Sequence, residues 1–201
     1  MDPKQQSPSN SFTAHHSISS FSVPVQAYLS ARPKEPPFYS YLAVGALVFD
    51  SSSPARILLI QRAATDSMPN RYETAGGGCD DEDPTILHSV ARELWEETGL
   101  TAARIGPQIG TGHLFLSRSG KVVCKFNFLV EAQRGSDGGF NVKLDPNEHQ
   151  SYLWAAEDEV KAERAGDIEL KFTTKGQKAI ILDAFETAKK LSVQPEDRAA
   201  D

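Results

Sequence analysis

The sequence predicts a layered α/β domain, in which helices pack against β-strands, and three observations carry this prediction. Short, continuous apolar runs at residues 41–49 and 55–62 are typical of buried strands. Apolar residues recur at the spacing of one helix face at residues 84–98, and again at 174–190. Strands that precede and follow one helix, with a second helix at the end, indicate an α/β or α+β layered architecture.

The elements are expected in a simple order along the chain. The two apolar runs are separated by "SSSP", which is typical of a turn, and a glycine-rich loop then leads into the first long helix. Residues 111–117 and 121–132 follow as two strands around the turn "RSG". In the second of these strands one face is apolar, formed by Val122, Cys124, Phe126, Phe128 and Val130. A short strand at 152–156 precedes the last helix.

The two ends of the chain are expected to lie outside the domain proper, which we place at residues 41–191. Residues 1–40 are predicted to be a flexible tail, because Ser, Pro, Gln and Asn dominate the first 20 residues and bury little apolar surface. Within this tail, residues 21–33 have the spacing of a short helix that docks on the domain. Residues 192–201 are predicted to be disordered.

Composition and charge exclude several classes of function. The net charge of −6 argues against a protein that binds nucleic-acid duplexes or anionic membranes, which usually carries a basic patch. The two cysteines, Cys79 and Cys124, have no metal-ligand spacing and are expected to be free thiols in a reducing compartment. No apolar run is long enough to cross a bilayer, and no secretory signal is recognisable. We therefore expect a cytoplasmic protein, with a transit peptide in the serine-rich N-terminus as the weaker alternative.

The first long helix is expected to run from Pro84 to Thr98. Asp83 is a good N-cap, and proline is favourable in a first helical turn. Gly99 lies where a left-handed residue would end a helix of this length.

Three glutamates, Glu93, Glu96 and Glu97, fall within an arc of roughly 100° on this helix. Such a cluster repels itself, and two explanations compete. The carboxylates could form a solvated face that Arg92 partly compensates, or they could bind Mg²⁺ or Mn²⁺, which prefer oxygen ligands. The glycines just before the helix favour metal binding, because bare backbone can approach an ion or a phosphate closely.

Residues 78–100 resemble the signature of the Nudix hydrolase family, G-x(5)-E-x(7)-R-E-U-x-E-E-x-G-U, where U is a bulky apolar residue. The residues that match with the correct spacing are Gly78, Arg92, Glu93, Leu94, Glu96, Glu97, Gly99 and Leu100. The preceding "NRYETAGGG" is similar to the family's aromatic-Glu-x-Pro-Gly-Gly approach, with Ala75 in place of the proline. The resemblance extends over about residues 41–190.

This resemblance implies an α/β/α sandwich with a mixed central β-sheet, and a metal-dependent hydrolase that cleaves the diphosphate linkage of a nucleoside diphosphate derivative or a related small phosphorylated molecule. It implies that Glu93, Glu96 and Glu97 are metal ligands, with Mg²⁺ or Mn²⁺ as the cofactor. The carbonyl of Gly77 or Gly78 would be a further ligand, and Arg92 would orient a ligand glutamate through a charge-assisted hydrogen bond.

The catalytic base is expected outside the signature, because its position varies within the family. Glu148, in an acidic loop before a late strand, is our candidate, and an exposed loop carboxylate without a role is the alternative. Arg92 and Glu93 are the other candidate catalytic residues. Tyr72, Gly76 and Gly77 are the candidates for substrate binding.

Pro84 stands where the signature has its first glutamate and offers no ligand atom. Glu82 or Asp83 could take over the missing role, or these acids could only complement the dipole at the helix N-terminus. This departure keeps two other functions open. One is an isomerase that uses the same diphosphate-metal site, and the other is a module that binds a nucleotide diphosphate without cleaving it.

Overall fold

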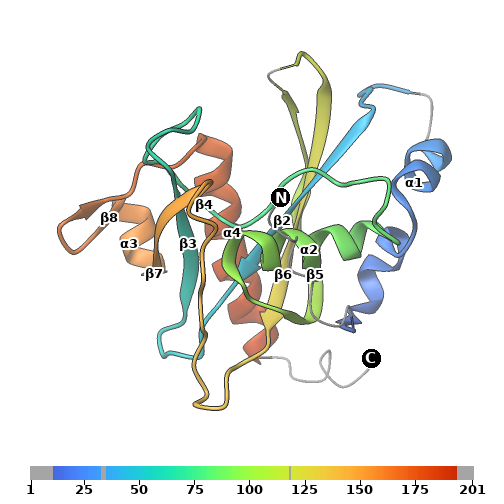
Figure 1. The fold of residues 1–201 in the computed structure, drawn as a ribbon. Coiled ribbons are helices and arrows are strands. Elements are labelled where there is room, and N and C mark those ends of the chain that lie inside the picture. Colours follow the sequence, from blue (N-terminus) through green and yellow to red (C-terminus); the bar gives the residue numbers. More distant parts are fainter. Residues whose placement is uncertain (1–10, 33–34, 118, 194–201) are drawn as a thin grey trace, which may run out of the picture.

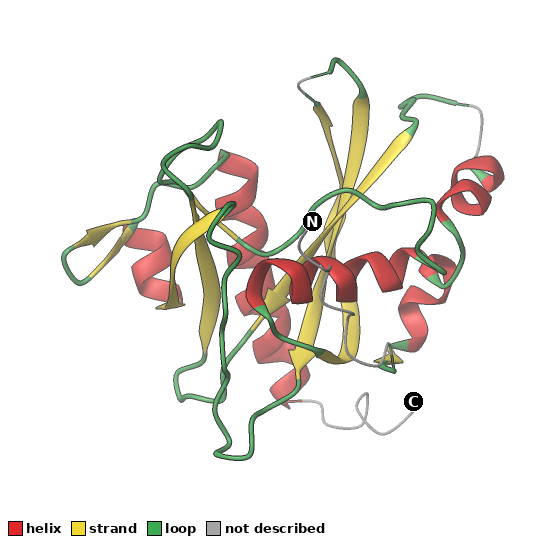
Figure 2. Cartoon of the chain, in the orientation of Figure 1, coloured by secondary structure: helices red, strands yellow, loops and turns green. Residues whose placement is uncertain are grey.

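The computed structural model describes residues 11–32, 35–117 and 119–193, and it arranges them as strands between helical layers (Figures 1 and 2). The strands are β1 (Thr13–Ala14), β2 (Tyr41–Val48), β3 (Arg56–Arg62), β4 (Tyr72–Glu73), β5 (Ala102–Leu116), β6 (Val122–Ala132), β7 (His149–Ala156), β8 (Arg164–Ala165) and β9 (Ile168–Glu169). The helices are the 3₁₀ helix η1 (His16–Phe21), α1 (Val25–Ala31), α2 (Ile86–Thr98), α3 (Glu157–Ala162) and α4 (Lys175–Val193).

The larger sheet is mixed and has the strand order β1-β5-β6-β2. β2 runs parallel to β6, in a register that pairs Tyr41 with Val123 and Val48 with Val130. β5 and β6 form a long antiparallel hairpin, whose tip projects from the top of the molecule in Figure 1. The smaller sheet, β4-β3-β7, is antiparallel, and β8 and β9 form a separate hairpin.

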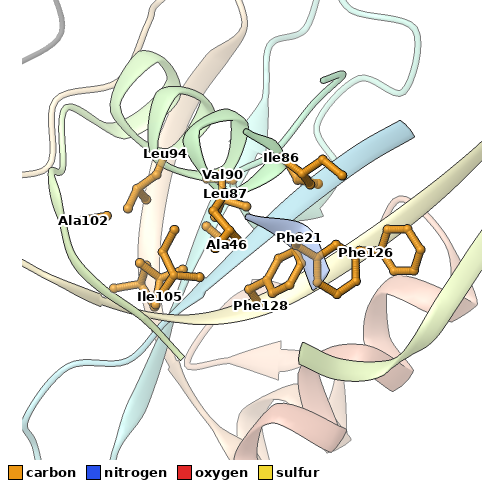
Figure 3. Close-up of a cluster of buried hydrophobic side chains, with 14 of the residues drawn as sticks. Phe21, Ala46, Ile86, Leu87, Val90, Leu94, Ala102, Ile105, Phe126 and Phe128 are labelled. Carbon is orange, nitrogen blue, oxygen red and sulfur yellow. The ribbon is translucent and has the colours of Figure 1, made fainter. Parts of the chain in front are cut away.

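The core lies on both faces of these sheets. Leu58 and Ile60 of β3 belong to a cluster with the apolar face of α2, whereas the alternate residues Ile57 and Leu59 belong to a second cluster with α4. Figure 3 shows the first cluster, with the apolar residues of α2 above those of the larger sheet. Because one residue in two points to each face of a strand, continuous apolar runs bury both faces. The predicted α/β/α sandwich is thus confirmed.

Several element boundaries differ from the prediction. β5 begins at Ala102, nine residues before the strand expected at 111–117, because its pairing with β6 is interrupted by register shifts that break the alternating pattern. The last helix, α4, extends to Val193 and so includes the first two residues of the predicted C-terminal tail. None of the helices in the described ranges is long and apolar enough to cross a membrane.

Residues 11–32 are not a flexible tail, which corrects the prediction for this part of the N-terminus. Ile18 and Phe21 are buried in the cluster that includes the apolar face of α2, which we call the α2-side core; the cluster with α4 is the α4-side core. The Phe21 ring packs edge-on against Phe126 and Phe128, with ring centroids 4.9 and 5.1 Å away. The polar composition concealed this packing, since one or two aromatic side chains bury enough area to anchor a short segment. The helix expected at 21–33 is α1. Residues 1–10, 33–34 and 194–201 lie outside the described part of the chain.

Candidate functional site

The glycine-rich loop runs against β2 before α2 begins. The backbone N–H of Val44 donates to the carbonyl of Gly77 at 2.9 Å, and that of Cys79 donates to Leu42 at 3.0 Å. Gly76 has φ 149°, and a Cβ there would lie 2.2 Å from the carbonyl oxygen of Val44. Only glycine permits this approach, so these contacts hold the loop firmly against the sheet.

The helix α2 starts later than the sequence suggested. Its N-cap is Thr85, whose hydroxyl accepts from the backbone N–H of His88, so the predicted cap at Asp83 and the first-turn position of Pro84 are wrong. Asp83 is used elsewhere, as described below. The C-terminal end is as predicted, because Gly99 adopts a left-handed conformation with φ 67°.

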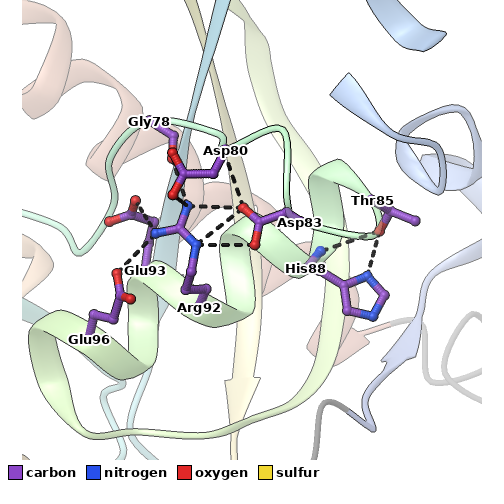
Figure 4. Close-up of polar contacts among 8 residues, drawn as sticks. All are labelled: Gly78, Asp80, Asp83, Thr85, His88, Arg92, Glu93 and Glu96. Carbon is purple, nitrogen blue, oxygen red and sulfur yellow. Dashed lines mark hydrogen bonds and ion pairs between the residues drawn. The ribbon is translucent and has the colours of Figure 1, made fainter. Parts of the chain in front are cut away.

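Arg92 is the centre of a polar cluster on α2 (Figure 4). Its Nη1 donates to Glu93 at 2.8 Å and to Glu96 at 2.9 Å. Its Nη2 donates to the carbonyl of Gly78 at 2.8 Å and to Asp83 at 3.0 Å. Burial opposes the charge of Arg92, but its hydrogen bonds with Asp83 and the charge of Glu93 outweigh burial and raise its pKa. The guanidinium therefore ties two of the helix glutamates to the glycine-rich loop.

The third glutamate, Glu97, is the most deeply buried of the three. It is 7% exposed and accepts a hydrogen bond of 2.7 Å from the backbone N–H of Gly76. Burial raises the pKa of Glu97 well above its ordinary value, and this hydrogen bond opposes the rise only in part. Burial likewise raises the pKa of Glu93, although Arg92 opposes the rise. Two buried carboxylates that repel each other are stabilised by a cation between them.

A cleft of about 700 Å³ opens beside these glutamates. Its charged lining residues are Glu93, Glu96, Glu97, Lys143, Asp145 and Glu148. Glu148 lies in the exposed loop before β7, and His149 is the first residue of that strand. One ligand atom each from Glu97, Glu148 and His149 lies within 4.8 Å of the other two. The fold therefore brings the predicted base candidate, from a loop far along the chain, to the helix glutamates.

The model of the NUDIX domain matches residues 40–175, which is more than half of the chain. The chain belongs to the Nudix family. No curated protein matches it. Membership of this family supports a pyrophosphohydrolase that acts on phosphorus-containing anhydrides.

Three solved structures are similar to this Nudix protein in fold. The MutT Nudix hydrolase from Burkholderia pseudomallei has a TM-score of 0.52 at 20% identity, over 70% of this chain and 95% of its own. The MutT protein from Methanosarcina mazei has a TM-score of 0.52 at 23% identity, over 78% and 99%. The Nudix domain of NrtR from Shewanella oneidensis, solved with ADP ribose, has a TM-score of 0.50 at 20% identity, over 81% and 97%.

Glu82 and Asp83, the two acids that could replace the glutamate missing at position 84, have different surroundings in the structure. Glu82 is exposed, as is Pro84 itself. Asp83 is 9% exposed and holds Arg92 with both carboxylate oxygens, at 3.1 Å from Nε to Oδ1 and 3.0 Å from Nη2 to Oδ2. Of the two, only Asp83 contacts the polar cluster of this Nudix protein, and it does so through Arg92.

Two of the residues predicted for the site have other surroundings than expected. Tyr72 does not line the cleft, because its side chain is 3% exposed and belongs to the α4-side core. Burial raises the pKa of its hydroxyl. The carbonyl of Gly77, predicted as a ligand, already accepts from Val44, so one of its two lone pairs is in use.

The fold places three further residues near the site that the sequence alone did not indicate: Glu73, Lys143 and His149. Glu73 accepts a hydrogen bond from Arg62 and lies 3.5 Å from Nε2 of His149. Its pKa is lowered, because contacts with His149 and Arg62 outweigh the effect of burial. Lys143 is the one cation among the residues that line the cleft. The glutamate of the aromatic-Glu pattern and the histidine next to Glu148 were the signals available in the sequence.

The residues present fit a divalent cation. A Cβ at Gly77 would lie 2.6 Å from Oε2 of Glu93, so glycine is needed for this carboxylate to rest against the loop. Glu97 is a buried carboxylate without a neutralising side chain in hydrogen-bond contact among the described residues. Carboxylate and carbonyl oxygens are the ligands that Mg²⁺ and Mn²⁺ take in proteins.

Proposed function

We propose that this Nudix protein is a Mg²⁺- or Mn²⁺-dependent hydrolase that cleaves the diphosphate linkage of a nucleoside diphosphate derivative or a related small phosphorylated molecule in the cytoplasm. The observation that carries the proposal is the meeting of Glu93, Glu96 and Glu97 with Glu148 at one cleft. ADP ribose in the Shewanella oneidensis domain is a ligand of the proposed class. The net charge of −6 disfavours a nucleic-acid duplex as substrate.

Different side chains would bind the ion, position its ligands and attract the substrate. Glu93, Glu96 and Glu97 would hold the ion, with the second lone pair of the Gly77 carbonyl as a further donor. Arg92 orients Glu93 and Glu96, because it donates to one oxygen of each. Lys143 would attract the phosphate groups of the substrate into an otherwise acidic cleft.

When bound, the divalent ion would neutralise the diphosphate and make water a better nucleophile at neutral pH. Glu148 is exposed, lines the cleft and would accept the proton that this water loses. The backbone N–H of Gly76 holds Glu97 in place, so the ligand set is ordered before the substrate arrives.

The test is Glu97→Gln, which keeps the size of the side chain and its acceptor for Gly76 but removes a ligand charge. We expect the fold to be retained and kcat at saturating Mg²⁺ to fall at least about 100-fold, or about 2.7 kcal/mol in activation free energy. Glu169→Gln, the same change at an exposed position of β9, is the control and should leave kcat unchanged. Wild-type kcat in Glu97→Gln would refute the metal-ligand role.

A screen of diphosphate substrates with product analysis separates the proposed hydrolase from its rivals. Release of phosphate or a nucleotide only with a divalent ion supports hydrolysis. A rearranged product without hydrolysis would instead identify an isomerase. A ligand that raises the melting temperature but is never turned over would identify a binding module.

A further inference from the structure

His149 is a buried histidine whose ring has an unusual environment. Its side chain is 1% exposed, yet neither ring nitrogen has a hydrogen-bond partner among the described residues. An imidazole without partners is costly to bury, because its polar atoms have lost water without compensation. A bound ligand that contacts the ring would remove this cost.

One nitrogen of the ring already has a carboxylate nearby. Nε2 lies 3.5 Å from Oε1 of Glu73, slightly too far for a good hydrogen bond. Arg62 holds that glutamate and is itself held by Asp66. Histidines that bind metals characteristically donate their second ring N–H to such a carboxylate, which fixes the tautomer and orients the ring. A hydrogen bond from Nε2 of His149 to Glu73 would leave Nδ1 to bind an ion.

The other neighbours of His149 are oxygen donors of the proposed metal site. One ring nitrogen of His149 and one oxygen each of Glu97 and Glu148 lie within 4.8 Å of one another. Two donors on opposite sides of one octahedral ion are about 4.2 Å apart, so a closure of roughly half an ångström brings the His149 nitrogen and the Glu97 oxygen to coordination distance. Glu148 is exposed and can instead remain at the distance of a bridging water, which preserves its role as base.

We infer that His149 is a ligand of the ion held by Glu97, and that its imidazole makes the site prefer a first-row transition ion over Mg²⁺. The inference rests on the proposed function, because it concerns the same metal site. Its physical basis is donor chemistry. Imidazole nitrogen binds Co²⁺ and Zn²⁺ more strongly than Mg²⁺, whereas carboxylates and carbonyls alone suit Mg²⁺.

The decisive test needs neither substrate nor turnover. Mn²⁺ is added below stoichiometry to the metal-free full chain, and pulsed electron paramagnetic resonance measures nuclear spins coupled to the ion. We expect a ¹⁴N coupling, replaced by a ¹⁵N coupling when the protein is grown with ¹⁵N-labelled histidine. Bound Mn²⁺ without any histidine nitrogen coupling would overturn the inference, even in a protein that hydrolyses its substrate. Conversely, the coupling would stand if no substrate were ever turned over.

Two variants assign the nitrogen and test the selectivity. His149→Gln should abolish the coupling, whereas His88→Gln should retain it, because His88 lies near the other end of α2 beside Thr85. By calorimetry, His149→Gln should weaken Co²⁺ binding at least about tenfold and change Mg²⁺ binding by less than about threefold. Equal losses for both ions, or a coupling that survives in His149→Gln, would refute the inference. The labelled wild-type protein decides the question if the variant does not fold.

Discussion

The change of Asp83 to asparagine tests how the chain compensates for the proline in its signature. Asp83 holds the Arg92 guanidinium through Nε and Nη2, at distances between 3.0 and 3.2 Å. The asparagine side chain would keep one acceptor oxygen but lose the negative charge. Arg92 would retain Glu93, Glu96 and the Gly78 carbonyl as partners, so the variant should fold.

The loss in the free energy of unfolding caused by Asp83→Asn follows from these contacts. A hydrogen bond to a charged group contributes about 1.5–3 kcal/mol, and Arg92 is only 21% exposed, so solvent screens the pair weakly. Because one acceptor remains, we expect a loss of about 2 kcal/mol. For a chain of this length that corresponds to a fall of about 4–8 °C in melting temperature. Arg92 would also bind Glu93 and Glu96 more strongly, so more Mg²⁺ would be needed for half-maximal activity.

The assay is thermal unfolding at several pH values, with Asp81→Asn as control, because Asp81 is an exposed acid in the same loop. Burial alone would raise the pKa of Asp83, but its hydrogen bonds with Arg92 outweigh burial and lower the pKa below its ordinary value. A carboxylate with a lowered folded-state pKa stabilises the protein above its unfolded pKa, and this contribution is lost as the pH falls. The difference between wild type and Asp83→Asn should therefore be full at pH 7 and shrink below about pH 4. Equal melting temperatures for Asp83→Asn and Asp81→Asn at pH 7 would refute the reasoning.

Three further predictions concern the N-terminal segment and the metal site. Phe21→Ala should lower the free energy of unfolding by about 3–5 kcal/mol in denaturant titrations, whereas Ser20→Ala, an exposed neighbour, should change it by less than about 0.5 kcal/mol. In the metal-free protein, the raised pKa of Glu97 means that its contribution to stability is lost as the pH rises through that pKa. The glutamine in Glu97→Gln cannot ionise. The melting temperature of this variant minus that of wild type, both measured in chelator, should therefore increase as the pH rises, and a difference that stays constant would contradict this. Pro84→Glu should lower the Mg²⁺ concentration for half-maximal activity without lowering the melting temperature, since glutamate is favourable just before a helix; an unchanged Mg²⁺ requirement would show that position 84 no longer matters.

Much of this fold could be predicted because the signals were local. The buried strands β2 and β3 were visible as apolar runs, and the helix α2 as an apolar stripe that ends at Gly99. Where local signals were broken or weak, prediction failed. Register shifts concealed the first half of β5, and the hydroxyl of Thr85 competed with Asp83 for the cap. Both residues offer an acceptor that could cap the helix, but Asp83 accepts hydrogen bonds from Arg92, nine positions away, and Thr85 therefore forms the cap.

The sequence by itself determined that Glu93, Glu96 and Glu97 share one side of a helix, because the helical period depends only on the backbone of neighbouring residues. Only the tertiary structure decided what faces them. The pairing of β7 with β3, which includes a register shift between Gln61 and Arg62, brings Glu148 to the cleft and His149 close to Glu97. Burial, which raises the pKa of Glu97, likewise follows from the packing of α2 on the sheet. Such contacts join residues far apart in the chain, so they depend on strand register and core packing, which no local pattern specifies.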